Sequence, residues 1–444
     1  MASKWGARGA SLAQGLLYRL SQAKHVCPHH DPVGSNSLTL RSGIGSCSAE
    51  GHADYAFEMI SSTLRFGVGV TAEVGYDVKN MGGKNPVIIT DKNVANTVAF
   101  KEVASSFSKL GLPCNVFDEV RCEPSVTSMQ SAIDYSRAKK FDCFVAVGGG
   151  SVIDTAKAAA LYTSNPAAEF LDYVQKPFGK ALLPEKAMLP LIAVPTTAGT
   201  GSETTGMPRN VAIYSGFDVL CHALESYTAK PYTMRTPRPS RPDERPVYQG
   251  SNPVSDVWVR EALRIIKKYF RRSIFDPEDM EARTAMLMAS SFAGMGFGNA
   301  GVHLCHGLSY PISSQGKKYV DPDYNKGHPL IPHGLSVVCT APEDFIFTTP
   351  ADPKRHMEAS QLLGGDLKST DSTEKIAHTL ADQLRGFMQD FNCPNGLSSL
   401  GFDRSGVDKL TDAALNSFRS NPIAPRDTDY DSIAAIYENS LNVY

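Results

Sequence analysis

The sequence predicts an α/β protein with an amino-terminal doubly wound parallel sheet and an all-helical carboxy-terminal part. Short apolar runs alternate with helical stretches up to residue 194, and a repeated β-α-β order indicates a parallel sheet. After residue 215, long stretches with helical periodicity replace the β-branched runs. We therefore expect a sheet domain over residues 54–206 and a helical domain over residues 207–444, preceded by a separate segment, residues 1–53.

Four short apolar runs are predicted as strands: 86–90, 115–117, 141–147 and 189–194. The chain between them is predicted to be helical. One helix runs through Leu110, and another spans 125–139, with Ser125 as its cap after Pro124.

In the second half, residues 253–270 and 279–295 have the periodicity of helices, and a loop rich in Pro and Arg, residues 230–249, interrupts the helical pattern.

Composition excludes several classes of protein. The formal net charge of −2 provides no basic field for nucleic acid or an anionic membrane, and no run of eighteen apolar residues could cross a bilayer. The nine cysteines are scattered, odd in number and without CxxC spacing. That usage argues against a disulfide framework and against an all-cysteine zinc site.

The first thirty residues are typical of a mitochondrial transit peptide. They contain the basic residues Lys4, Arg8, Arg19 and Lys24, a helically spaced leucine stripe, and no acidic residue before Asp31. We expect residues 1–53 to be a transit peptide and linker that direct the protein to the mitochondrial matrix. A disordered amino-terminal tail is the alternative.

The motif VAVGGGSVIDTAK lies where a predicted strand meets a helix. Glycines allow tight turns and a close approach to a ligand, and a helix amino terminus favours a pyrophosphate. A simple flexible turn would look similar. Two neighbours favour a nucleotide cleft: Asp91, at the end of the first strand, could accept hydrogen bonds from ribose hydroxyls, and PTTAGTGSE, residues 195–203, follows another strand.

A candidate metal site begins in GFDVLCHALE, residues 216–225. Asp218 and His222 are four residues apart and therefore share one helix face. His306, in HGLSYP, and His333, in IPHG, could complete a mixed N/O site suited to Fe(II) or Zn(II). His303 competes with His306, and each histidine taken alone is better explained as a packed or surface residue.

Five motifs in this order resemble the iron-containing (type III) alcohol dehydrogenases: GGGSVIDTAK, PTTAGTGSE, GFDVLCHALESY, HGLSYP and PHG. The loop KPYTMRTPRPSRPDERPVYQGSNP and the mitochondrial start resemble one branch, which transfers hydride from a hydroxy acid to an oxo acid. The resemblance implies a metal-binding helical domain and a cofactor-binding sheet domain. It also implies oxidation of 4-hydroxybutyrate to succinate semialdehyde, coupled through tightly bound NAD(H) to reduction of 2-oxoglutarate to D-2-hydroxyglutarate.

The resemblance assigns roles residue by residue. It implies metal ligation by Asp218, His222, His306 and His333, contact of Asp91 with the adenosine ribose, and cofactor binding by Gly149, Gly150, Ser151, Thr196 and Thr197. The family often has a second histidine four residues after the third ligand, and here that position is Tyr310. A catalytic histidine at that position therefore does not carry over.

A second departure from the family is larger. Several dozen residues normally separate the SETTG-like segment from the Met-Pro before the metal helix, whereas here Gly206 is followed directly by Met207. The missing stretch would supply the last strands of the cofactor domain. We therefore expect an internal deletion that leaves a sheet edge unpaired.

Small hydroxy and oxo acids are the expected partners, with no nucleic acid and no membrane span, and a homo-oligomer is left open. Arg238, Arg241 and Arg245 are candidates to bind the substrate carboxylate, although each alone is as well explained as a solvated charge. Two rival functions stay open. One is an ordinary NAD-dependent alcohol dehydrogenase, and the other is an inactive deletion variant that acts only as a binding partner.

Overall fold

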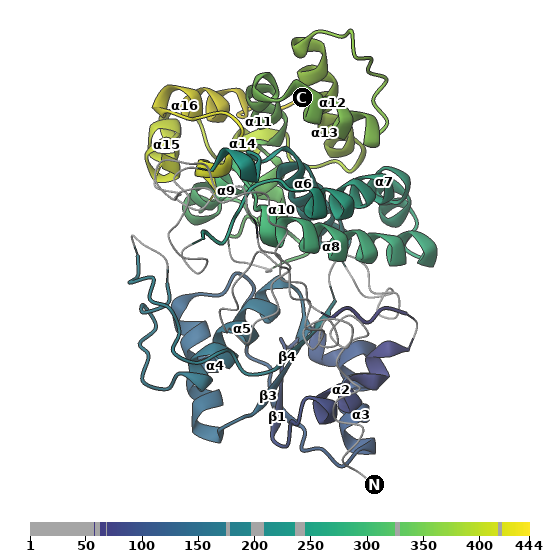
Figure 1. The fold of residues 1–444 in the computed structure, drawn as a ribbon, viewed down its shortest axis with the longest axis vertical. Helices are drawn as coiled ribbons and strands as arrows, with labels where there is room; N and C mark the ends of the chain where they lie inside the picture. The colour runs from purple at the N-terminus through teal and green to yellow at the C-terminus, as the bar shows by residue number, and fades with distance from the viewer. Residues whose placement is uncertain are drawn as a thin grey trace, which may run out of the picture.

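The protein is described by a computed structural model covering residues 57, 63–67, 69–174, 178–196, 208–235, 245–324, 329–415 and 420–444. Two parts lie one above the other in Figure 1: an α/β part in purple to blue and a helical part in teal to yellow. The expected transit peptide and linker, residues 1–53, lie outside the described residues. The junction between Gly206 and Met207 also lies outside them.

A four-stranded parallel sheet forms the centre of the α/β part, with the order β2-β1-β3-β4. Its strands are β1 (Pro86–Ile89), β2 (Asn115–Phe117), β3 (Cys143–Gly148) and β4 (Leu191–Pro195). All four predicted strands are confirmed to within two residues at each end. Strand β3 starts later than expected, at Cys143, and the Asp142 carboxylate just before it accepts the backbone N–H groups of Lys84 and Asn85.

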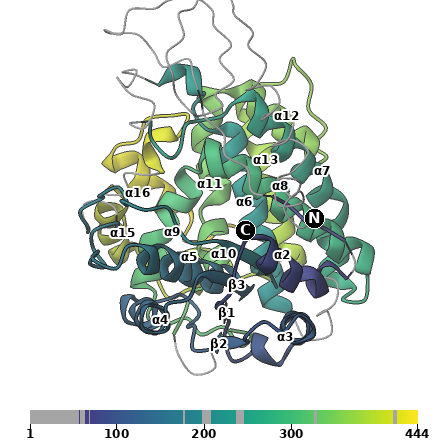
Figure 2. The same ribbon diagram turned by 60° about the horizontal axis from the view of Figure 1, so that its bottom comes forward.

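Helices cover both faces of this sheet, as the doubly wound fold requires (Figure 2). They are α2 (Val74–Asn80), α3 (Val98–Lys109), α4 (Val126–Lys139) and α5 (Gly150–Ser164). Alternate residues of β1 enter different cores: Val87 and Ile89 pack with α4 and α5, whereas Ile88 packs with α2 and α3. The period of two in the strand therefore divides the core into two layers.

Strand β4 differs from its neighbours in burial. Every residue of β1 and β3 is buried, whereas no residue of β4 is, and Ala193 is exposed. In the described part of the chain, β4 forms one edge of the sheet and β2 forms the other. An edge in a sheet of this type is normally covered, because parallel strands are buried on both faces. The exposure of β4 agrees with the expected loss of the strands that would follow it.

The carboxy-terminal part is helical, and beyond residue 207 the described residues contain no strand. Its longer helices are α6 (Arg209–Thr228), α7 (Pro253–Phe275), α8 (Met280–Ala300), α9 (Leu304–Gln315) and α13 (Thr373–Asp390). The others are α10 (His333–Val338), α11 (Ala341–Thr348), α12 (Pro353–Leu362), α14 (Gly396–Ser399), α15 (Val407–Leu415) and α16 (Tyr430–Asn439).

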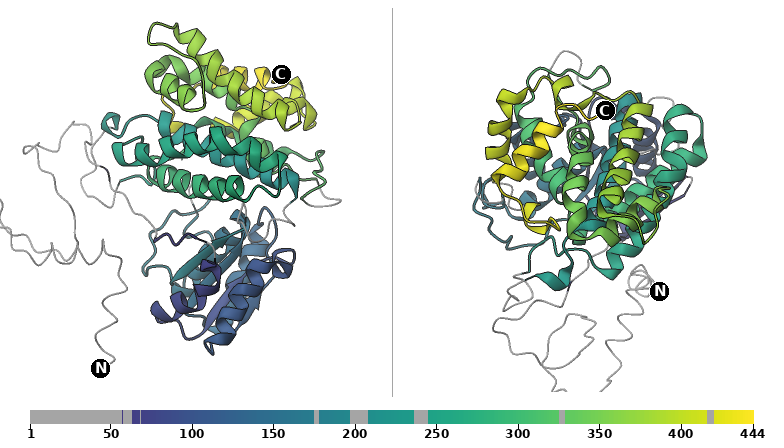
Figure 3. Two further views of the ribbon diagram at one scale, coloured as in Figure 1. Left: turned by 90° about the vertical axis from the view of Figure 1, so that its right-hand side faces the viewer. Right: turned by 90° about the horizontal axis from the view of Figure 1, so that it is seen from above.

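One continuous core joins these helices. The rings of Phe217, Phe270 and Phe391 meet at centroid distances of 4.8–5.8 Å, which ties α6 to α7 and to the segment after α13. Figure 3 shows the helical part as a layer stacked over the α/β part. None of the helices in the described ranges is long and apolar enough to span a membrane.

Candidate metal and cofactor site

Three helices bring candidate metal ligands together. Asp218 lies on α6, His306 on the first turn of α9, and His333 at the start of α10. The Asp218 Oδ1 atom is 3.3 Å from His306 Nε2 and 3.5 Å from His333 Nε2. One ligand atom from each residue lies within 4.8 Å of the other two. A carboxylate oxygen and two imidazole nitrogens therefore converge on a single point.

His222 borders this group without being part of it. Its Nδ1 atom is 3.8 Å from Asp218 Oδ2, in line with their spacing on one face of α6. Its ring stacks on Phe297 at a centroid distance of 4.0 Å and on His306 at 4.4 Å. The four expected ligands therefore lie in one neighbourhood, and three of them point ligand atoms at one another.

Close packing of α10 against α6 brings His333 to Asp218. A Cβ atom on Gly334 would lie 1.9 Å from the backbone oxygen of Tyr214 and 3.3 Å from the Asp218 side chain. Only glycine fits at this contact. The PHG motif therefore combines a ligand with the residue that allows the ligand's helix to approach.

Electrostatics at the group favour a bound cation. Burial disfavours the charged form of Asp218, yet the nearby imidazoles outweigh burial and lower the pKa of its carboxyl. Burial lowers the pKa of His222 to about 4. Burial also acts on His306, but the charges of Glu225 and Asp218 raise its pKa to about 10. His306 is buried, whereas Asp218 and His333 are partly exposed. A carboxylate oxygen and imidazole nitrogens that converge in this way fit a divalent transition metal.

Glu225 is a buried carboxylate behind His306 that the sequence reasoning missed. It is fully buried on α6, and its Oε2 atom accepts a hydrogen bond from His306 Nδ1. Burial opposes its charge, but His306 outweighs burial and lowers the pKa of Glu225. The signal was available, because Glu225 lies three residues after His222 and seven after Asp218, on the same helix face.

The structure also separates the two competing histidines. His306 faces Asp218, whereas His303 is fully buried with its Nε2 atom 3.0 Å from the Thr228 hydroxyl. His303 thus points toward the end of α6 and away from the convergent group.

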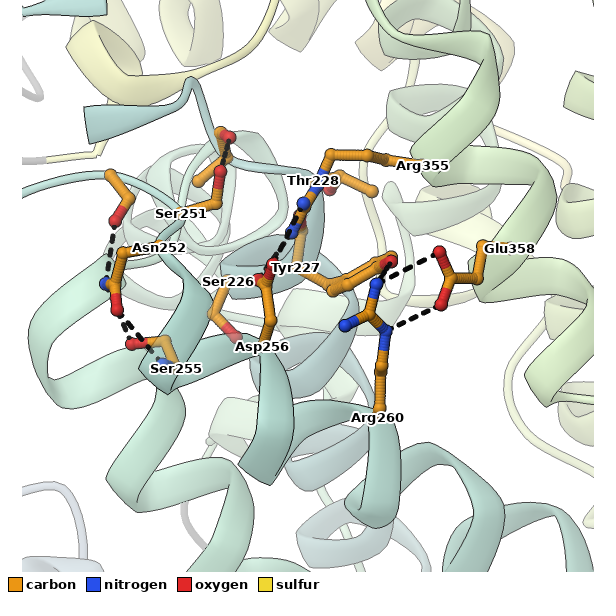
Figure 4. Close-up of polar contacts among 12 residues, drawn as sticks. Ser226, Tyr227, Thr228, Ser251, Asn252, Ser255, Asp256, Arg260, Arg355 and Glu358 are labelled. Atoms are coloured by element: carbon orange, nitrogen blue, oxygen red, sulfur yellow. Dashed lines mark hydrogen bonds and ion pairs between the residues drawn. The ribbon is translucent and has the colours of Figure 1, made fainter. Parts of the chain in front are cut away.

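A polar cluster holds the last turn of α6 behind the site (Figure 4). The Arg355 guanidinium donates to both oxygens of Asp256, at 2.5 and 3.0 Å, and to the backbone oxygen of Tyr227. Arg260 donates to the side-chain hydroxyl of the same Tyr227 and forms an ion pair with Glu358. Two guanidiniums therefore clamp Tyr227 and fix the direction of the helix that carries Asp218.

The candidate cofactor loop joins β3 to α5. Gly149 is the N-cap of α5 and has no side chain with which to cap it. None of Gly148, Gly149 and Gly150 has a positive φ, so a left-handed turn is not the reason for this triplet. A Cβ on Gly148 would lie 2.5 Å from the Val152 side chain, so close packing of strand and helix requires glycine there. No side chain caps this helix amino terminus, so side-chain capping does not compete with a ligand there.

Glu123 links this helix end to the candidate metal group. Its backbone N–H donates to the Ser151 hydroxyl at 3.2 Å, and its own φ is 52°. Burial raises the pKa of the Glu123 carboxyl, His333 lowers it and Asp218 raises it again, so this side chain lies near the ligands. Glu123 therefore contacts the start of α5 through its backbone and interacts with the convergent group through its carboxyl charge.

The remaining expected residues are placed as follows. Asp91 Oδ1 accepts the backbone N–H groups of Asn93 and Val94, which caps its own turn. Thr196 follows β4, and its N–H donates to the Gly148 oxygen. Arg245 is partly buried and Tyr310 is about half exposed. Thr197, Arg238 and Arg241 lie outside the described residues.

Two family models match the chain. The iron-containing alcohol dehydrogenase model matches residues 61–208, and the carboxy-terminal model of the same family matches residues 244–441. The chain belongs to the iron-containing alcohol dehydrogenase family. It is thus an oxidoreductase, and the family implies NAD(H) and a divalent metal as cofactors.

Curated relatives match along nearly the whole chain. Two proteins named hydroxyacid-oxoacid transhydrogenase, mitochondrial, are 57% identical (Caenorhabditis briggsae) and 56% identical (Caenorhabditis elegans) over 469 residues. Each alignment covers 98% of this chain and 100% of the relative. A solved structure titled 1,3-propanediol oxidoreductase is 22% identical, covers 87% of this chain and 100% of its own, and has a TM-score of 0.71. That likeness shows the fold.

The same alignments contain positions that this chain lacks. An alignment of 469 residues that uses 98% of a 444-residue chain must leave gaps on this chain's side. The relatives therefore have residues without a counterpart here, as the expected internal deletion requires.

Proposed function

We propose that this iron-containing alcohol dehydrogenase family member is a mitochondrial hydroxyacid–oxoacid transhydrogenase. It oxidises 4-hydroxybutyrate to succinate semialdehyde and passes the hydride through bound NAD to 2-oxoglutarate, which becomes D-2-hydroxyglutarate. The observation that carries the proposal is the convergence of Asp218, His306 and His333. Relatives at up to 57% identity bear the transhydrogenase name, which supports the choice of substrates.

Each part of the cleft has a role in this proposal. Asp218, His222, His306 and His333 hold the metal, which would be Fe(II) or Zn(II), while Gly149, Gly150 and Ser151 receive the cofactor pyrophosphate. Asp91, Thr196 and Thr197 line the rest of the cofactor cleft. The metal would supply Lewis-acid polarisation of the substrate oxygen, and NAD would carry the hydride. The chain itself would position both groups, and it shields His306, which is 3% exposed, from water.

Retention of NADH distinguishes the proposal from an ordinary alcohol dehydrogenase. In a transhydrogenase the cofactor stays bound while one acid leaves and the other enters. The hydride from the hydroxyl carbon of the first acid is therefore held on the bound cofactor and then passes to the keto carbon of the second. We expect 4-hydroxybutyrate deuterated at carbon 4 to deliver its label to carbon 2 of D-2-hydroxyglutarate.

The decisive experiment is an assay of purified, metal-loaded protein with 4-hydroxybutyrate, with and without 2-oxoglutarate. We expect sustained turnover only when 2-oxoglutarate is present. Sustained formation of free NADH with added NAD alone would instead identify an ordinary dehydrogenase. Absence of both turnover and NAD binding would identify a variant that acts only as a binding partner.

A first prediction concerns His222. Its replacement by Ala should remove one of four ligands and strongly weaken metal binding, even though His222 borders the convergent group. Elemental analysis after gel filtration measures the metal content. His378→Ala, which changes an exposed histidine on α13, is the matched control. Equal occupancy in both variants would remove His222 from the ligand set.

A second prediction concerns substrate choice. Both acids carry a carboxylate remote from the reacting carbon, and Arg238, Arg241 and Arg245 lie in the loop after the metal helix. A charge-assisted contact contributes roughly 1.5–3 kcal/mol, so removing the right arginine should weaken acid substrates about ten- to a hundred-fold. Kinetics of single Arg→Ala variants with 4-hydroxybutyrate and 1-butanol test this. Equal loss of both substrates in all three variants would contradict it.

Two further points stay predictions. Residues 1–53 are proposed to direct the chain to the mitochondrial matrix, and the relatives named mitochondrial support the organelle. The second prediction is that the protein assembles into a homo-oligomer.

A further inference from the structure

Glu225 makes two kinds of contact with the segment that carries His306. Its Oε1 atom accepts the backbone N–H of His303 at 2.9 Å and that of His306 at 3.3 Å. Its Oε2 atom meets Nδ1 of the His306 ring. The side chain is 0% exposed, so water does not compete for either oxygen. One carboxylate on α6 therefore serves both the backbone and the ring of a residue 81 positions later in the chain.

The first contact completes the start of α9. A helix leaves its first N–H groups without partners inside the helix, and a side chain at the N-cap usually supplies one. The N-cap of α9 is His303, and no side-chain bond of its own caps the helix. Glu225 takes over this task from the neighbouring helix, because its Oε1 atom accepts the N–H of His306 within the first turn.

The second contact determines which nitrogen of His306 carries the proton. A carboxylate that already accepts two backbone N–H groups offers only acceptor atoms, so Nδ1 must donate to Oε2. The Nε2 atom of the neutral ring then keeps its lone pair. That atom lies 3.3 Å from Asp218 Oδ1, at the side where the candidate ligands converge.

We propose that Glu225 is a positioning residue that both caps α9 and holds His306 in the tautomer whose Nε2 atom can bind metal. The proposal rests on the metal site of the proposed function and adds a residue that does not touch the metal. Histidine ligands commonly donate their second N–H to such a carboxylate, and losing that partner typically weakens metal affinity ten- to a hundred-fold.

Replacement of Glu225 by Gln tests the ring contact separately from the cap. The amide has the same shape, and its oxygen can still accept from the backbone of His303 and His306. Its NH₂ group then faces Nδ1 and donates to it, which moves the ring proton to Nε2. If the side-chain amide is flipped, its NH₂ group faces the backbone N–H groups of His303 and His306 instead, and donor then opposes donor. Both orientations disfavour metal binding while the volume of the core is unchanged.

The experiment uses the metal-free protein and Co²⁺ alone. We expect Glu225→Gln to bind Co²⁺ about ten- to a hundred-fold more weakly than the wild type, with an altered ligand-field spectrum. Nitrogen-15 spectra of the metal-free protein, recorded at an alkaline pH where the ring is neutral, should show the His306 proton on Nδ1 in the wild type and on Nε2 in the variant. Asp256→Asn is the matched control, because Asp256 is also a largely buried carboxylate and supports α6 without touching a candidate ligand.

Each outcome bears on one proposal or on both. Weaker Co²⁺ binding in Glu225→Gln, with wild-type affinity in Asp256→Asn, supports the positioning role. Equal Co²⁺ affinity in the wild type and Glu225→Gln overturns it and leaves the metal site intact. The same loss in both variants shows that general damage to α6 is the cause and also overturns it. A wild type that fails to bind Co²⁺ overturns the metal site itself, and the positioning role with it.

Discussion

Buried histidines of the helical part show how much surroundings decide the chemistry of one residue type. His306 lies between Asp218 and Glu225, and their charges raise its pKa to about 10 against the effect of burial. Among the described residues, no carboxylate contacts the ring of His356 on α12: its nitrogens meet the Thr348 hydroxyl and the backbone oxygen of Asp352. Burial therefore dominates and lowers the pKa of His356 to about 3.

The buried His356 should make the protein sensitive to acid. Below the ordinary histidine pKa of 6.5, the unfolded chain binds a proton that the folded chain takes up only near pH 3. Because the unfolded state then binds more protons, stability falls as pH falls, by about 1.4 kcal/mol per pH unit in this window. Between pH 6.5 and 5 we expect the wild type to lose about 2 kcal/mol more than His356→Gln.

Denaturant unfolding of the metal-free protein at several pH values measures this difference. His378→Gln, at an exposed position, controls for the loss of a histidine as such. If the free energies of unfolding of the wild type and His356→Gln fall in parallel between pH 6.5 and 5, His356 does not set the acid sensitivity.

At the scale of elements, the site depends on how closely its helices pack. Asp218 belongs to α6, and His333 reaches it only because α10 contacts the backbone of α6 at Tyr214. The end of α6 is in turn clamped by Arg355 and Arg260 on either side of Tyr227. Ligand geometry is therefore a property of three packed helices.

Gly334→Ala should disturb this packing. The added Cβ would lie 1.9 Å from the Tyr214 oxygen, so α10 must shift and carry His333 with it. We expect Co²⁺ binding weaker by on the order of tenfold, as for other changes that misplace a ligand, together with a lower melting temperature.

Gly298→Ala is the control for Gly334→Ala, because a Cβ at this exposed position on α8 meets nothing within 4 Å. Removing a helical glycine there should raise stability by roughly 0.5–1 kcal/mol. Wild-type Co²⁺ affinity in Gly334→Ala would show that α10 tolerates the extra methyl group and that its packing does not set the ligand distance.

At the scale of the molecule, the sheet ends at the exposed strand β4, where the family-length segment would be expected to follow. Strand β4 has no buried residue, although β1 and β3 are fully buried, and the relatives have residues that this chain lacks. A missing edge removes both hydrogen-bond partners and apolar cover.

Restoring the family-length segment after Gly206 should therefore stabilise the protein. We expect the restored chain to melt at a temperature higher by at least a few degrees, since about 1 kcal/mol shifts the melting temperature of a mid-sized domain by 2–4 °C. It should also bind NAD more tightly. Calorimetry of both chains measures the two quantities. Equal melting temperatures and equal NAD affinities would mean that the shortened sheet is self-sufficient.

The sequence by itself determined the elements and their periodicity. The runs 86–90 and 141–147 became β1 and β3 because alternation and burial are properties of a few consecutive residues. The pair Asp218 and His222 shares a face of α6 for the same local reason. Ordered motifs such as GGGSVIDTAK and PHG likewise indicated the family that the comparisons then showed.

Only the tertiary structure decided which side chains meet. His303 and His306 are three residues apart, and local pattern could not choose between them. Packing of α9 against α6 turned His306 toward Asp218 and His303 toward Thr228. The contact of Glu225 with His306 spans 81 positions, and that of His333 with Asp218 joins helices far apart in the chain. Such distances depend on how whole helices pack, because periodicity reports only on neighbours within a turn or two.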